Sequence, residues 1–207
     1  MGIEIRPATP DDAAVCAPLM YYSGPEVFNF FVGSKDATDS YTFLELAFRE
    51  NAGEFGYAHH LVAELEGQVV GVAIGFGKAE VSEFNKVMIK FLFRYFGILG
   101  GIGACFRGMM IELSIKGPGA GEYVVAHIGV NPECRGQGVG SRLLEALYAQ
   151  GRERGLKNAV LDVAGTNPRA QALYEREGFV VTHTVKGGRS SAHGGIVSHY
   201  RMAKPLS

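Results

Sequence analysis

The feature that most constrains the fold of this 207-residue chain is a glycine-rich segment at residues 130–141. The run reads V-N-P-E-C-R-G-Q-G-V-G-S, and apolar residues at helical spacing follow it from 143 to 148. This pattern predicts a strand end, a glycine loop and a helix start. Because glycines lack a Cβ and tolerate unusual dihedrals, successive N–H groups can turn to one side and bind an anion beside the positive end of the helix dipole. Such a junction is typical of a pyrophosphate site.

A dinucleotide site is the first alternative for this loop. Its fingerprint, G-x-G-x-x-G, counted from Gly136, would place the third glycine where this chain has Ser141. Asp162, some twenty residues further on, could imitate the ribose-binding acid of that motif. The loop lies two thirds of the way along the chain, however, and too little sequence follows it for a dinucleotide domain.

A second motif occupies residues 167–179, which read N-P-R-A-Q-A-L-Y-E-R-E-G-F. Asn at the cap, Pro at the first helical position and Gly past the end predict a short helix. Together with R-G-Q-G-V-G, the pattern N-x-x-A-x-x-L-Y-x-x-x-G-F resembles the GNAT superfamily of acyl-CoA-dependent N-acetyltransferases. The similarity is strong over residues 122–180, and the opening I-R-P-A-T-P-D-D-A is a looser match over residues 1–20.

The fold that follows is a single domain over residues 1–207 in the α/β (α+β) class. The resemblance implies a GNAT-like mixed, mostly antiparallel central sheet of about seven strands with helices on both faces. The residue pattern places two parallel strands at 121–130 and 159–163, joined across the helix that follows the glycine loop. The resemblance implies that these two strands splay apart and that the pantetheine arm of acetyl-CoA, the implied cofactor, lies in the gap.

The expected cofactor contacts gather on the glycine loop, on the strand before it and on the second motif. We expect the diphosphate to be held mainly by main-chain groups of the loop, with Arg135 adding charge at the rim. The full set of expected cofactor contacts is Ile128, Gly129, Val130, Arg135, Gly136, Gln137, Gly138, Val139, Gly140, Ser141, Asn167 and Tyr174.

The resemblance also assigns the proton donor for the leaving thiolate to Tyr174, since a phenol is protonated at neutral pH. The positions on strand 121–130 where the family carries a base hold Val124 and Ala126, which cannot transfer protons. Glu122 has the matching strand parity, so we expect it to act as the base, with a water chain as the alternative. His127 has the opposite parity and is expected to face the core or a helix unless a bulge intervenes.

Composition excludes several other classes. The formal net charge is −1 and the basic residues form no stripe, so we expect no nucleic-acid partner. Three distant cysteines and the pair His59–His60 lack metal-ligand spacing, which argues against a disulfide framework and a metal site. An N-terminus without an apolar signal region and the scattered cysteines fit a cytoplasmic protein.

Residues 81–115 are unusually apolar, and charges such as Lys86, Lys90 and Arg94 interrupt them. A membrane span needs about 20 consecutive apolar residues, so we predict an amphipathic cover helix broken by the glycine cluster at 97–103. This helix leaves a homodimer interface or an acyl pocket open as roles.

The predicted function is transfer of an acetyl group from acetyl-CoA to a primary amine of a small molecule or peptide, by direct attack in a ternary complex. The missing base at Val124 and Ala126 motivates one alternative, a non-catalytic acyl-CoA-binding sensor or partner module of the same fold. A second alternative is an acyltransferase that docks on a membrane or protein through residues 84–106. The acceptor cannot be read from the segments 23–50 and 81–120 that would bind it.

Overall fold

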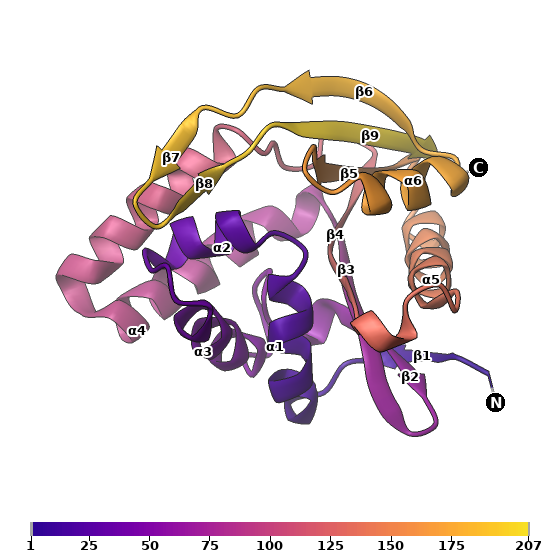
Figure 1. Ribbon diagram of the computed structural model, residues 1–207, viewed down its shortest axis with the longest axis horizontal. Coiled ribbons are helices and arrows are strands. Elements are labelled where there is room, and N and C mark those ends of the chain that lie inside the picture. Colours follow the sequence, from indigo (N-terminus) through magenta and orange to yellow (C-terminus); the bar gives the residue numbers. More distant parts are fainter. Residues whose placement is uncertain (1, 207) are drawn as a thin grey trace.

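The computed structural model describes residues 2–206. Within them, seven strands form one mixed sheet in the order β1-β2-β3-β4-β5-β9-β6, and two short strands form a separate hairpin (Figure 1). The strands are β1 (Glu4–Pro7), β2 (His60–Leu65), β3 (Gln68–Gly77), β4 (Glu122–Val130), β5 (Asn158–Ala164), β6 (Val180–Val185), β7 (Arg189–Ser191), β8 (Gly194–Ile196) and β9 (His199–Pro205). The helices are α1 (Ala13–Tyr21), α2 (Pro25–Val32), α3 (Ala37–Phe48), α4 (Lys78–Glu112), α5 (Val139–Glu153) and α6 (Pro168–Arg176). The predicted fold class is confirmed.

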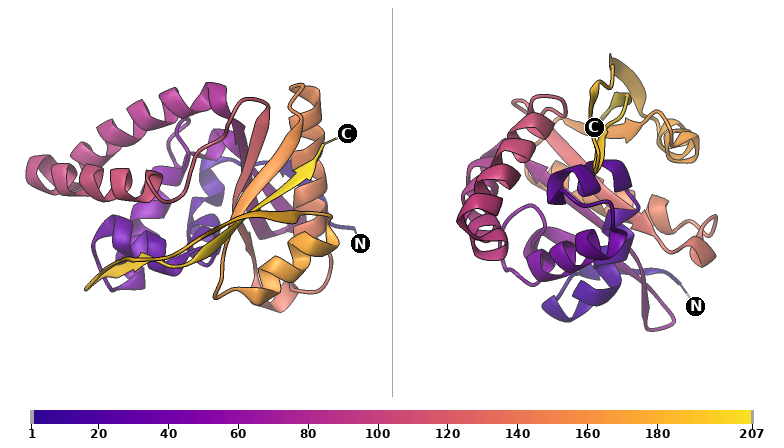
Figure 2. Two further views of the ribbon diagram at one scale, coloured as in Figure 1. Left: turned by 90° about the horizontal axis from the view of Figure 1, so that it is seen from above. Right: turned by 60° about the vertical axis from the view of Figure 1, so that its left-hand side comes forward.

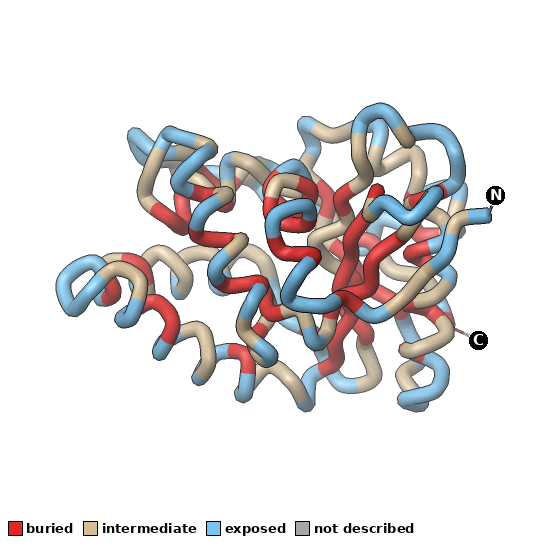
Figure 3. Tube along the Cα trace, turned by 90° about the horizontal axis from the view of Figure 1, so that it is seen from below, coloured by how far each residue is buried: buried red, intermediate tan, exposed pale blue. Residues whose placement is uncertain are grey.

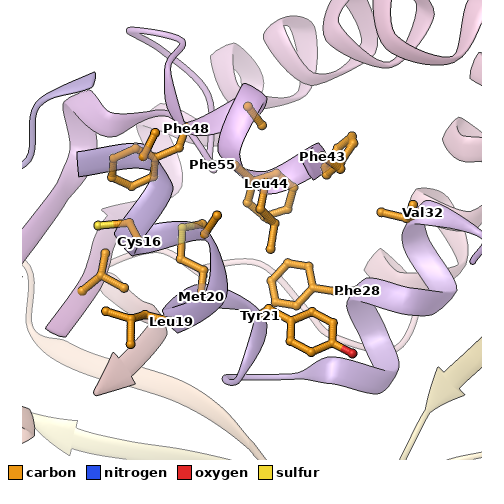
Figure 4. Close-up of a cluster of buried hydrophobic side chains, with 14 of the residues drawn as sticks. Cys16, Leu19, Met20, Tyr21, Phe28, Val32, Phe43, Leu44, Phe48 and Phe55 are labelled. Atoms are coloured by element: carbon orange, nitrogen blue, oxygen red, sulfur yellow. The ribbon is translucent and has the colours of Figure 1, made fainter. Parts of the chain in front are cut away.

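Helices cover both faces of the sheet (Figure 1). On one face α5 buries Leu143, Leu144 and Leu147, whose spacing of one, three and four residues keeps them on one side of the helix. On the other face α1, α2, α3 and α4 enclose a second cluster that is rich in aromatic rings. Figure 4 shows part of this cluster, with Phe28 from α2, Phe43 from α3 and Phe55 from the loop after α3.

The two parallel strands diverge as the resemblance implied. β4 and β5 pair from Glu122–Asn158 to Val124–Val160, whereas β4 continues to pair with β3 as far as Val130. The carboxyl-terminal half of β4 therefore has a partner on one edge and a gap on the other. Backbone groups that face this gap are free to bind a ligand.

Two glycine-bounded segments, residues 25–33 and 187–196, form regular elements. Pro25 begins α2 and Gly33 ends it with a left-handed φ of 81°, so the helix carries ordinary start and stop signals. The glycine-rich stretch around 187–195 forms the hairpin of β7 and β8, which lies along α2 (Figure 1). A Cβ at Gly194 would come within 2.5 Å of the Glu26 carbonyl oxygen, so glycine lets this hairpin touch the helix backbone.

The glycine cluster interrupts α4 as expected, and the break lies at its first member, Gly97. There a left-handed φ of 69° folds the chain back, so α4 consists of two arms, residues 78–96 and 98–112 (Figure 2). A Cβ at Gly101 would lie 2.7 Å from Cδ1 of Phe93, so the glycine admits a ring from the first arm. The turn between the arms is exposed (Figure 3), with Leu99 86% accessible. Among residues 2–206, only α4 meets the length and composition of a membrane span, and it does so only when both arms are counted as one helix across the fold-back at Gly97.

Candidate active site

The glycine loop forms the cradle that its sequence predicts. Gly136 and Gly138 have left-handed φ values of 83° and 86°, and Gly138 caps the N-terminus of α5. The N–H groups of Val139, Gly140 and Ser141 lie in the first turn, where a helix has no internal acceptor for them. They and the positive end of the helix dipole face the cavity, which these three residues line.

A cavity of about 1090 Å³ runs from this cradle along the free edge of β4 to the two arms of α4. Its lining includes eleven of the twelve expected cofactor contacts: Ile128, Gly129, Val130, Arg135, Gly136, Gly138, Val139, Gly140, Ser141, Asn167 and Tyr174. Gln137 is missing from the described lining. Its side-chain amide instead donates to the Glu133 carbonyl oxygen at 3.3 Å.

The strand register decides which backbone groups of β4 face the gap. The N–H of Asn131 donates to the Val70 carbonyl oxygen on the β3 side at 2.8 Å. Because backbone groups alternate along a strand, the N–H of Val130 points the other way, toward the gap. The Val130 carbonyl oxygen lies on that side as well, since it accepts a hydrogen bond from Nε of Arg135 at 3.3 Å.

Tyr174 projects from α6 into this cavity. The side chain is only 8% exposed, and its ring packs edge-on against Phe179 at 6.0 Å between centroids. Burial raises the pKa of its phenol well above the ordinary value. The hydroxyl therefore stays protonated at neutral pH, as a proton donor must. Asn167 is the cap of the same helix, because its Oδ1 accepts from the Ala170 N–H at 3.1 Å.

Glu122, the expected base, lies outside the described lining of the cavity. Its Oε2 accepts hydrogen bonds from the Gly119 N–H at 2.8 Å and from Nη2 of Arg201 at 3.2 Å. The other Arg201 nitrogen, Nη1, donates to Asp162 at 2.7 Å. Burial raises the pKa of Asp162 even though Arg201 opposes the shift. This placement gives Glu122 a structural role and argues against the role expected for it.

His127 occupies a β-bulge, and the bulge reverses the direction expected from strand alternation. Ile74 pairs with Ala126 and Val72 pairs with Gly129, so two residues of β4 lie opposite the single Ala73 of β3. His127 itself adopts a left-handed φ of 52°, which is uncommon for a residue with a side chain. The bulge that the sequence left open is therefore present, and His127 lines the cavity while its ring packs against Phe28 of α2.

Around His127 the structure gathers groups from several distant segments. Its Nε2 lies 3.1 Å from Oε1 of Glu54, in the loop after α3. Its ring lies 5.2 Å from Phe55 and 5.7 Å from Phe28, between centroids. The neighbouring His60 ring is 6.2 Å away, and burial lowers the pKa of His60 to about 3, so His60 is neutral. A left-handed residue held this way is typical of a functional site.

Sequence reasoning missed several charged residues that line the cavity: Glu26, Glu54, Glu112, Lys116, Arg169 and Arg176. Glu54 is one, and no local pattern marks it, since it lies in a loop 73 positions before its partner His127. Arg169 and Arg176 are two more. They lie seven residues apart on α6, two turns of one helix face, and that spacing was a readable signal beside the motif. Among residues 2–206, no cluster of His, Cys, Asp and Glu could hold a metal ion.

Comparisons with known proteins agree with this geometry. The profile of the Acetyltransferase (GNAT) family matches residues 25–179. Mycothiol acetyltransferase of Propionibacterium freudenreichii is 37% identical over 78 residues, which cover 38% of this chain and 25% of that protein. The chain spans a quarter to a half of the length of the curated relatives that it matches.

Solved structures show the same fold over the whole chain. An N-acetyltransferase from Staphylococcus aureus Mu50 aligns with a TM-score of 0.69 at 18% identity, covering 97% of this chain and 100% of that one. A phosphinothricin acetyltransferase from Sinorhizobium meliloti, solved in complex with AcCoA, aligns with a TM-score of 0.58 at 20% identity, covering 100% and 90%. With its family match over most of its length, this chain belongs to the GNAT family of acetyltransferases.

Proposed function

We propose that this protein is an acetyl-CoA-dependent N-acetyltransferase that acetylates a primary amine of a small molecule or peptide. One observation supports this most: a single cavity joins a left-handed glycine cradle, the free edge of β4, Tyr174 and the His127–Glu54 pair. Anion binding, carbonyl binding and two proton-transfer groups are the parts that acyl transfer to an amine requires.

The residues present suit coenzyme A as the acyl carrier. First-turn N–H groups at 139–141 would bind the diphosphate, and Arg135, Arg169 and Arg176 would add positive charge around it. The N–H of Val130 faces the gap, where it would hold the pantetheine arm or the carbonyl oxygen. Acetyl-CoA would supply an activated thioester carbonyl. Holding that carbonyl beside the amine provides much of the rate by orientation alone.

His127 takes the place of Glu122 as the proton acceptor in this proposal. An ammonium group must lose a proton before its nitrogen can attack. Nε2 of His127 faces Glu54 and would donate its hydrogen to that carboxylate, which leaves Nδ1 as the nitrogen that accepts the proton. The carboxylate would orient the imidazole and stabilise it after it gains the proton. Tyr174 would donate its phenolic proton to the departing thiolate sulfur. His127 therefore acts on the amine that attacks, and Tyr174 acts on the thiolate that leaves.

The non-catalytic alternative loses its motive with this arrangement. That module was considered because the usual base positions hold Val124 and Ala126. The bulge brings an imidazole to the cavity from the next residue along the strand.

The cytoplasm remains the expected setting, with no nucleic-acid partner and with a homodimer left open.

Two variants test the proposal. Tyr174→Phe should lower kcat by at least about tenfold while leaving the Kd for coenzyme A nearly unchanged. His127→Gln should lower kcat by a similar factor, with part of the loss recovered at higher pH, where more of the amine is already neutral. The assay follows thiol release from acetyl-CoA with a panel of amines, and calorimetry measures coenzyme A binding. Wild-type protein that binds no coenzyme A, or binds it but releases no thiol with any amine, would contradict the proposal.

A further inference from the structure

The cavity extends well beyond the cradle, and most of the side chains at its far end are apolar. Both arms of α4 contribute to this end, which we call the acceptor wall. The first arm supplies Phe84, Met88, Ile89 and Leu92 together with the polar Asn85, and the second supplies Met109 and Ile111 together with Glu112 at its end. Phe76 of β3 closes one side, with its ring 5.3 Å from that of Phe84. The wall depends on the fold-back at Gly97, because that turn brings the second arm beside the first.

The acceptor wall is continuous with the reacting centre. Phe28, Phe31 and Phe55 line the cavity between the wall and His127, and their rings lie within about 6 Å of one another along the series Phe28–Phe55–Phe31. A substrate whose nitrogen reaches His127 and whose body extends toward the wall therefore lies along these rings. A polar substrate that is buried against these rings would have hydrogen-bonding groups without partners.

One polar group on this side of the cavity is shown beside His127, the carboxylate of Glu54, which pairs with the imidazole. The other polar lining residues here include Glu26 of α2, Asn85 and Glu112 of α4, and Lys116 after it. Carboxylates attract the ammonium form of an amine toward the centre. Apart from Asn85 and Glu112, the wall offers hydrocarbon and thioether surface. The distribution matches a ligand with one cationic end and one apolar body.

From this geometry we infer that the acceptor is a primary amine joined to a hydrophobic body, such as a long alkyl or arylalkyl amine. This inference rests on the proposed acetyltransferase function and names the substrate class of the same site. The amine nitrogen lies at His127, and the apolar body lies along the phenylalanine rings against the acceptor wall. Polyamines, aminoglycosides and polar amino acids are poorer substrates, because the phenylalanine rings and most of the acceptor wall offer their polar groups no hydrogen-bond partner.

A homologous series of n-alkylamines from butylamine to decylamine tests this class. Amine basicity barely changes along the series, so differences report burial of the chain. Each methylene removed from water stabilises the complex enough for roughly a fourfold change in an equilibrium constant. We expect kcat/KM to rise by up to about fourfold per methylene until the cavity is filled. A flat or falling series would overturn the inference.

A matched pair of variants on α4 locates the effect. Met88→Gln keeps the side-chain size but places an amide in the acceptor wall, and it should lower kcat/KM for octylamine on the order of tenfold. Ile102→Gln makes a polar change on the second arm at a residue that is 55% exposed and outside the described cavity lining. It should leave kcat/KM unchanged. Both variants should keep the KM for acetyl-CoA, which shows that the cradle is intact.

Peptide amines distinguish the source of the hydrophobic body. Two tripeptide amides, one beginning with Phe and one with Ser, are compared with phenethylamine. Preference for the Phe peptide and for phenethylamine supports the inference, and the faster of the two identifies the source. Turnover that favours spermidine or the Ser peptide would overturn the inference while leaving the acetyltransferase function standing. Absence of coenzyme A binding would overturn both.

Discussion

The glycine cradle allows a clean test, because Gly138→Ala changes backbone preference and almost nothing else. Gly138 is exposed and has a left-handed φ of 86°, and an added Cβ would meet no atom of residues 2–206 within 4 Å. The left-handed conformation is disfavoured for alanine by about 1–2 kcal/mol. In the free protein the exposed loop can relax, so the free energy of unfolding should fall by less than about 1 kcal/mol.

Binding of coenzyme A must restore the left-handed conformation, because only then do the N–H groups converge on the diphosphate. The conformational cost therefore falls on binding, and we expect the Kd for coenzyme A to rise by roughly tenfold, which corresponds to about 1.4 kcal/mol. Isothermal titration calorimetry measures the Kd, and urea denaturation measures stability. Gly138→Asn should lie between wild type and Gly138→Ala, since asparagine tolerates left-handed dihedrals better.

Gly67→Ala is the matched control. Gly67 is also left-handed, with a φ of 76°, and also lacks neighbours within 4 Å among the described residues, but it turns the β2–β3 hairpin. The strand ladder holds that turn in place, so this variant should lose about 1 kcal/mol of stability and keep its Kd. A Gly138→Ala protein that binds coenzyme A within about twofold of wild type would refute the reasoning about the cradle.

Three further predictions concern groups outside the reaction. Burial raises the pKa of the Cys16 thiol, so a thiol reagent should modify Cys134 and spare Cys16. Cys134 lines the cavity, so bound coenzyme A should slow its reaction, and mass spectrometry of each site measures both effects. Hydrogen bonds from Arg6 lower the pKa of Asp12, so Asp12→Asn should lower the free energy of unfolding by about 1–3 kcal/mol at neutral pH. The difference from wild type should shrink below about pH 4, where the unfolded wild-type carboxyl binds a proton. Urea midpoints measured against pH test this, and a constant difference would count against it. Burial lowers the pKa of His60 to about 3, so below pH 6.5 the unfolded state binds a proton that the folded state does not. The free energy of unfolding of wild type should therefore fall as the pH drops below 6.5, and that of His60→Leu should fall less steeply. Equal slopes of stability against pH would exclude His60 as the cause.

Local sequence determined the parts of this protein whose signals are contiguous. The glycine loop with its helix and the Asn-to-Phe motif with Tyr174 each carry their caps, turns and apolar spacing within some fifteen residues. Backbone preference acts on neighbours, so these elements form as predicted and meet in one cavity. The parallel strand pair followed from them, because a short crossover helix joins it.

Tertiary structure alone decided the acceptor side of the site. The register between β3 and β4 creates the bulge at His127, and register depends on two strands together, so neither strand encodes it. Packing brings Glu54 to His127 and displaces Glu122 into a contact with Arg201. The acceptor wall exists because α4 turns back at Gly97, a choice between a continuous and a folded helix that depends on what each arm packs against.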